Sequence, residues 1–179
     1  MAFAVWQPGM TITAQRANLA AMIGAVVFAA ARTTGQTIPS GTETAANALQ
    51  WDSIDVDLLS GWSAANPSRW TVPVAGLWTL SGAISVNGTT TPGTTRDALW
   101  YVNGGALVSG RARTYAESGI SSSPLTVEAR TITKRLAAGD YVELVPAHNA
   151  NNAGTAVSLP TATGTFAPYA NVTYAGPAN

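Results

Sequence analysis

The segment Ser68–Val86, SRWTVPVAGLWTLSGAISV, constrains the fold more than any other part of the chain. After a corner at residues 73–76, apolar side chains recur at alternate positions, which is the period of a β-strand and not of a helix. Proline cannot donate to a β-ladder, so Pro73 belongs at the bend. We therefore predict a strand with one face in the core. The residues expected on this buried face are Trp78, Leu80, Ile84 and Val86.

Short apolar runs separated by turn signals continue through the rest of the sequence. Asn103-Gly104-Gly105 is a hairpin signal between expected strands at 98–102 and 106–113, and residues 137–140 turn into a strand at 141–145. Residues 125–136 are expected to form one long strand. Other strands are expected at 25–32, 48–51, 156–159 and 166–174. The sequence thus predicts an all-β jelly-roll sandwich of about eight to ten antiparallel strands.

The N-terminal segment has a different period. Apolar residues within 13–23 follow helical spacing, which predicts a short amphipathic helix. A helix of about eleven residues is marginal alone, so it needs a partner surface. We divide the chain into an arm and helix at 1–24 and a jelly-roll head at 25–179. The candidate attachment residues on the arm are Trp6, Leu19, Met22 and Ile23. The alternative is a helix that packs back on its own domain or trimer.

Composition excludes several classes of function. Charged residues make up 10% of the chain, and the formal net charge is zero with no basic stripe, so we expect no nucleic-acid partner. No apolar run approaches the roughly 20 residues of a membrane span, and the order of basic and apolar residues is not that of a secretory signal. No cysteine is present, which excludes disulfides and thiolate metal sites. Removing water from a surface with few charges costs little free energy, which favours assembly into a larger complex.

Four pieces of the chain, in the right order, resemble the globular head of the complement/tumour-necrosis-factor jelly-roll superfamily. They lie at residues 27–29, 69–78 (RWTVPVAGLW), 99–104 and 136–144 (LAAGDYVEL). The chain looks most like the versions at the C-terminus of bacteriophage virion proteins. In addition, WQPGMTITAQRAN near the N-terminus resembles the lead-in of short actinobacterial-phage tail or capsid-associated proteins. The resemblance implies a homotrimer that is made in the bacterial host cytoplasm and joins other virion proteins in the phage particle.

No catalytic pattern is present in the sequence. The single histidine, His148, lies in an Asn-rich stretch without a nucleophile motif, and no phosphate-binding or dinucleotide glycine pattern occurs. Asp52, Asp55 and Asp57 lie close together, but their spacing is not that of a calcium loop, and we interpret them as solvated loop acids. We therefore expect a protein that is not an enzyme and that needs no metal or cofactor.

The six tryptophans are the remaining candidates for ligand binding, since exposed aromatic rings can stack on sugars. We assign the strand residues Trp70, Trp78 and Trp100 to packing and keep Trp51 and Trp62 as possible ligand-binding residues. The leading hypothesis is a structural virion protein: a trimeric head tethered to the tail or capsid by its N-terminal segment. The alternatives are a module that binds host-surface glycans and a capsid decoration without any ligand.

Overall fold

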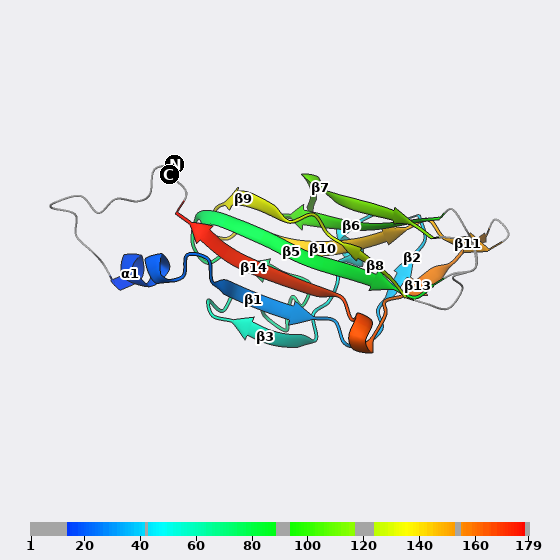
Figure 1. The fold of residues 1–179 in the computed structure, drawn as a ribbon, viewed down its shortest axis with the longest axis horizontal. Helices are drawn as coiled ribbons and strands as arrows, with labels where there is room; N and C mark the ends of the chain where they lie inside the picture. The colour runs from blue at the N-terminus through cyan, green and yellow to red at the C-terminus, as the bar shows by residue number, and fades with distance from the viewer. Residues whose placement is uncertain (1–13, 42, 89–93, 117–123, 153–154, 178–179) are drawn as a thin grey trace.

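The computed structural model describes residues 14–41, 43–88, 94–116, 124–152 and 155–177. Within these residues, two antiparallel sheets face each other in a sandwich (Figure 1). The six-stranded sheet contains β1 (Val26–Ala31), β3 (Ser53–Asp57), β5 (Gly76–Val86), β8 (Leu125–Glu128), β9 (Ile132–Leu136) and β14 (Tyr169–Gly176). The four-stranded sheet contains β4 (Trp70–Thr71), β6 (Thr95–Val102), β7 (Gly105–Tyr115) and β10 (Tyr141–His148).

Shorter elements close the two ends of the sandwich. Figure 1 shows the helix at one end and two small two-stranded sheets toward the other. These elements are α1 (Ala14–Ala21), β2 (Thr37–Pro39) with β13 (Ser158–Pro160), β11 (Asn151–Asn152) with β12 (Thr155–Ala156), and the 3-10 turns η1 (Ala45–Asn47) and η2 (Gly164–Phe166). Among the described residues, no helix has the length and apolarity that a membrane crossing requires.

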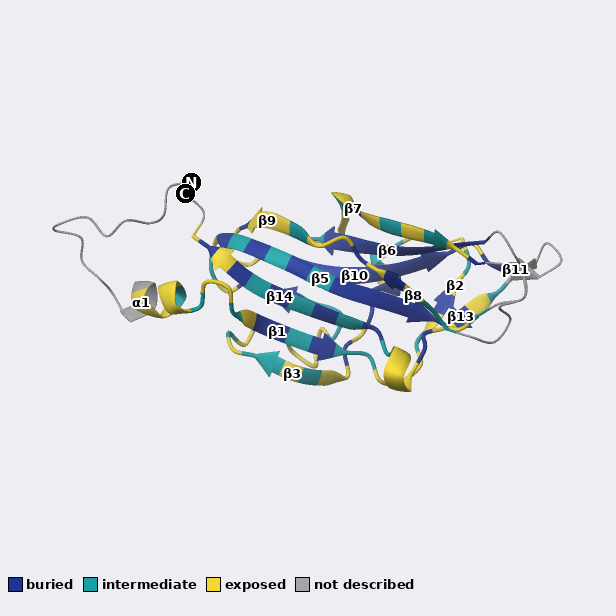
Figure 2. Cartoon of the chain, in the orientation of Figure 1, coloured by how far each residue is buried: buried dark blue, intermediate teal, exposed yellow. Residues whose placement is uncertain are grey.

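The core lies where the sequence predicts it. Trp78, Leu80, Ile84 and Val86 are at most 1% exposed. Figure 2 shows β5, β6 and β10 as the most continuously buried strands. The inner faces of β6 and β10 lie in the sandwich, and their other faces are covered because Leu99, Tyr101, Val145 and Ala147 form a second buried cluster with Ala48. The alternation along β5 therefore identifies the face that packs against the opposite sheet.

An aromatic row runs through the core and joins both sheets. The ring centroids of Phe28 and Trp70 lie 6.1 Å apart, those of Trp70 and Trp78 5.2 Å, and those of Trp78 and Tyr174 4.8 Å. Tilted and edge-on pairs at these distances add to the stabilisation from burial. Trp70 and Trp78 are therefore packing residues, as expected.

The strand expected over residues 125–136 is divided in two. Both β8 and β9 pair with β5, but the ladder is interrupted at residues 129–131, of which only Ala129 still donates to β5, to Gly82 O at 2.8 Å. The reason is a bond to the facing sheet: the indole Nε1 of Trp100 donates to the carbonyl oxygen of Arg130 at 3.0 Å. A single uninterrupted strand was therefore the wrong prediction, because a cross-sheet contact redirects the backbone.

Two expectations for residues 48–57 were also wrong. Residues 48–51 form no strand, because their amides donate to scattered partners: that of Leu49 to Leu144 O at 2.9 Å and that of Trp51 to Pro67 O at 3.0 Å. Conversely, residues 53–57, expected as a loop of acids, form the edge strand β3 beside β1. Ile54 and Val56 supply a half-buried face there, so the period of two was present between the aspartates.

Candidate functional site

A shallow hollow of about 840 Å³ follows β7, the edge strand of the four-stranded sheet. Its wall combines one stretch of β7 with the connection between β8 and β9 and with the chain before η1. The lining residues are Glu43, Arg111, Ala112, Arg113 and Arg130. Three guanidinium groups against one lining carboxylate make this hollow an exposed, cation-rich concavity in a chain that has few charges.

Asp97 on β6 holds two of these arginines in fixed directions. Arg113 donates to it through two parallel bonds, Nε to Oδ1 at 2.7 Å and Nη2 to Oδ2 at 2.6 Å, and Arg111 donates to Oδ2 through Nη1. The second arm of Arg111 donates to Glu43. The Asp97 side chain is 4% exposed, whereas those of Arg111 and Arg113 are 39% and 43% exposed. A buried carboxylate therefore orients two guanidinium groups that remain open to solvent.

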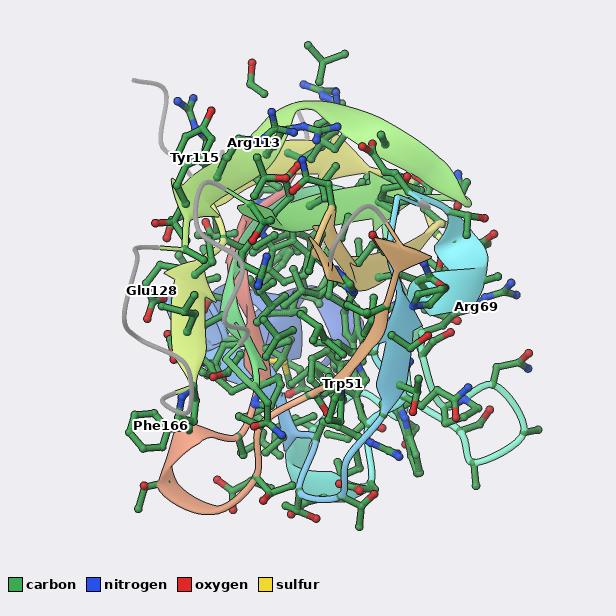
Figure 3. The ribbon with its side chains drawn as sticks, turned by 90° about the vertical axis from the view of Figure 1, so that its right-hand side faces the viewer. Trp51, Arg69, Arg113, Tyr115, Glu128 and Phe166 are labelled. Carbon is green, nitrogen blue, oxygen red and sulfur yellow. The ribbon has the colours of Figure 1, made fainter. Side chains whose placement is uncertain are left out.

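These contacts keep both arginines charged. Hydrogen bonds to Asp97 and the charge of that carboxylate raise the pKa of Arg113. The pKa of Arg111 is raised mainly by its hydrogen bond to Glu43. Tyr115, which is 59% exposed, lies next to Arg113 on the outer side of β7 (Figure 3) and also raises the pKa of Arg113. An exposed phenol ring therefore borders the cationic hollow.

Arg130 differs from the other two arginines because it has no carboxylate partner among the described residues. Its backbone carbonyl is fixed by Trp100, so the residue is anchored while its side chain is exposed. Together with Asp97, the residues that line the hollow carry three positive charges, on the arginines, and two negative charges, on Glu43 and Asp97. One positive charge is left in excess, and it belongs to Arg130.

The two tryptophans predicted to bind a ligand lie elsewhere. Trp51 is 3% exposed and belongs to the main core, and Figure 3 shows it inside the sandwich. Trp62 is half-buried and packs against the same core, and its Nε1 donates to Pro67 O at 3.1 Å. The ring of Trp51 is therefore not available at the surface, and a ligand role for Trp62 stays a prediction.

The three neighbouring aspartates have separate surroundings. Partial burial favours a higher pKa for Asp52, but hydrogen bonds from the amides and hydroxyls of Thr33 and Thr34 outweigh it and hold the pKa at about 2. Asp57 accepts from the Gly61 and Trp62 amides and from the Trp70 indole, while Asp55 is exposed. Over the described residues, no group of three or more His, Cys, Asp or Glu side chains is placed to hold a metal ion.

The candidate attachment residues fall into two groups. Leu19 and Met22 are half-buried and pack against the main core, whereas Ile23 is 53% exposed. Trp6 lies outside the described residues. Two of the apolar residues of the helical segment therefore pack against the chain's own core, and Ile23 remains exposed at the surface.

His148 is buried, and both nitrogens of its ring have hydrogen-bond partners. Its Nε2 lies 2.7 Å from Ile38 O, and its Nδ1 accepts from the Ala150 amide at 3.2 Å. Burial lowers the pKa of His148, and the charge of Arg96, its neighbour on β6, lowers it further, although the bond to Ile38 acts in the opposite sense. The neutral ring is thus a structural group that fixes β2 to the end of β10.

Sequence reasoning missed the arginine cluster. Arg111 and Arg113 lie two positions apart in an expected strand, so their side chains share one face. That signal was available in the sequence. By contrast, the positions of Asp97 and Arg130 beside them depend on strand pairing and on the course of the chain after β8, which residue spacing does not encode.

No protein-family model matches this sequence, and no curated protein does. Among solved structures, the globular domain of zebrafish complement 1qA protein is similar, with a TM-score of 0.53, 14% sequence identity and coverage of 84% of this chain and 98% of that chain. Eiger TNF from S. frugiperda is similar with a TM-score of 0.60, 11% identity and coverage of 86% and 95%. The fold is a C1q/TNF-like jelly roll.

The C1q/TNF-like jelly roll confirms the fold class predicted from the sequence, and it is the fold that the resemblance implied. At these identities, the similarity concerns the fold alone. The bacteriophage context of the resemblance therefore stays a prediction. What the arginine hollow can bind is inferred from its own geometry.

Proposed function

We propose that this chain is a structural protein of a bacteriophage virion, a C1q/TNF-like head that forms a homotrimer and is attached to the tail or capsid through its N-terminal end. The phage context rests on the sequence resemblance. The trimer is supported by one observation above all, which is the character of the outward face of the six-stranded sheet. The proposal includes no catalytic step and no cofactor.

The outward face of strands β1, β14 and β5 carries no charge. Strand pairing brings its side chains together in register, with Asn171 opposite Ala29 on one side and Ser81 on the other. The half-buried residues of this neutral face are Ala29, Ala31, Leu77, Thr79, Ser81, Tyr169, Asn171 and Thr173. Because no ionised group loses its hydration there, covering the neutral face costs little, and its small side chains allow close approach.

An exposed apolar patch lies where α1 leads into β1. Ile23, Val26 and Leu58 are 53%, 43% and 59% exposed, and the Leu58 amide donates to Val27 O at 2.9 Å, which fixes it beside β1. We call these three residues the α1-end patch. Covering exposed aliphatic side chains removes apolar surface from water, which stabilises an interface by about 25 cal/mol per Å². The patch supports attachment at the end of the head from which the N-terminal segment emerges.

The trimer is tested by light scattering of the full chain at micromolar protomer concentration. We expect a stable trimer with on the order of a thousand Å² buried per subunit. Replacing Ser81 at the centre of the neutral face by Asp should give folded monomers. Lys134→Asp should leave the trimer intact, because Lys134 is an exposed residue of β9 that pairs with Trp78 and so lies off the neutral face. A wild-type chain that stays monomeric contradicts the trimer.

Attachment is tested separately, by incorporation into phage particles. Deleting residues 1–23 should leave a folded, trimeric head that no longer joins the particle. Since Leu19 and Met22 pack on the core, a second variant, Ile23→Asp, retains both and removes only an exposed anchor. Attachment through this end is refuted if the deleted head unfolds or becomes monomeric, or if both variants still enter particles at the wild-type level.

Binding of a host-surface glycan is the second candidate function. The observation that favours it is the arginine hollow on β7, with the exposed Tyr115 ring at its border. A structural head and a glycan-binding head are compatible, because none of the residues that line the hollow belongs to the neutral face, and three of them lie on β7 of the four-stranded sheet.

A further inference from the structure

We infer that the hollow on β7 is a binding site for an acidic glycan, with Arg130 as the principal contact for a carboxylate or phosphate group and Tyr115 as a platform for the adjoining sugar ring. This inference deepens the glycan-binding candidate above and rests on it. It moves the ligand contact from the tryptophans to the arginines, and it names the charge of the ligand.

The first argument is that the site is organised before any ligand binds. The buried Asp97 carboxylate fixes Arg113 through two bonds and Arg111 through one, so neither guanidinium has to be ordered by the ligand. Pre-ordered donors lower the entropic cost of binding. Arg113 uses Nε and Nη2 for Asp97, and its side chain remains 43% exposed.

The second argument concerns charge. The pairs with Asp97 and Glu43 compensate Arg111 and Arg113, whereas Arg130 shares the same hollow without a described carboxylate partner. A planar guanidinium presents a fork of donors that matches two oxygens of a carboxylate or phosphate. An oxyanion placed in the hollow would therefore pair with Arg130 and have the other two cations nearby.

The third argument favours a glycan over an acidic peptide. A peptide would bind by extending the sheet along β7, but that edge is interrupted: Ser109 has a φ of 65°, and the pairing with β6 shifts between Leu99 and Tyr101. The uninterrupted edge covers only residues 111–115. Moreover, the lining offers Ala112 alone as an apolar side chain, whereas Tyr115 supplies an exposed aromatic ring of the kind that stacks on sugars.

The experiment measures binding of defined oligosaccharides to the full chain by titration calorimetry at low and high salt. The probes are an oligogalacturonate, its methyl ester of equal length, and a glycerol-phosphate oligomer, with an alternating glutamate–alanine peptide for comparison. We expect the carboxylated or the phosphorylated probe to bind with an affinity that falls as salt rises, and the uncharged ester not to bind. Comparing the two acidic probes identifies which group the hollow prefers.

Matched variants assign the binding to the hollow. Arg130→Gln removes the uncompensated charge without breaking any described side-chain contact, and should weaken binding at least about tenfold. Arg130→Lys should recover part of the loss, because it restores the charge without the fork. Tyr115→Ser should weaken binding of the oligogalacturonate more than binding of the glycerol-phosphate oligomer, because only the former has a sugar ring that can stack on the phenol. Lys134→Gln, which removes an exposed cation outside the lining, is the control and should change affinity less than about twofold.

Any one of four results would overturn the inference: equal binding of the methyl ester, affinity unchanged in Arg130→Gln, tighter binding of the acidic peptide than of every glycan, or no binding of any probe. Each of these outcomes leaves the light-scattering and particle-incorporation tests unaffected, so failure of the acidic-glycan site is distinguishable from failure of the structural role.

Discussion

Truncating Leu80 to alanine tests the packing that underlies the fold. Leu80 is 0% exposed at the middle of β5, paired with Val172 on β14 and Ile132 on β9. Removing three buried carbons costs about 2.4 kcal/mol at about 0.8 kcal/mol each. Strands on both sides are held by their own ladders and cannot collapse into the space. The residual cavity should therefore raise the loss to about 3–5 kcal/mol.

The assay is urea unfolding followed by tryptophan fluorescence, at one fixed protomer concentration because the proposed trimer would add to the apparent stability. The same loss corresponds to a fall in Tm of about 6–20 °C for a chain of this size. Leu58→Ala is the matched control: it removes the same atoms from a side chain that is 59% exposed, and should cost less than about 0.5 kcal/mol. A loss below about 0.5 kcal/mol for Leu80→Ala would show that the assigned core face is wrong.

Three other perturbations have expected outcomes. Because the pKa of Asp52 is about 2 in the folded chain instead of 3.8, ionised Asp52 stabilises the fold above that range, and its contribution is lost as pH falls toward 2. Solvent screening reduces this contribution to about 1 kcal/mol, which a pH series of unfolding free energies on wild type and Asp52→Asn should show as a difference that disappears in acid. Gly82→Ala places a Cβ 2.5 Å from the main-chain oxygen of Tyr169, so urea unfolding should show a loss of about 1–3 kcal/mol. Asp97→Asn weakens the bonds to two half-exposed arginines and should cost about 1–2 kcal/mol in the same assay; an unchanged midpoint would mean that Asp97 does not order them.

The structure explains why the neutral outward face was harder to predict than the core. Both faces of β5 follow from its period of two, and the buried face is recognisable by Trp78 and Leu80. However, Asn171 and Ala29 join the outward face only because β14 pairs with both β1 and β5, strands far apart in the sequence. Pairing over such distances depends on the whole set of strands competing for one sheet, which no local pattern contains.

The sequence by itself determined the fold class, the buried face of β5 and the hairpin at Asn103-Gly104, because strand period and positive-φ turn residues act over a few positions. Only the tertiary structure decided the division of residues 125–136, the burial of Trp51 and the gathering of Asp97 with its arginines. Each of these depends on a contact between segments remote in the chain, such as the Trp100 indole bonding to Arg130 across the sandwich. Local propensity selects the kind of element, and long-range packing selects its neighbours.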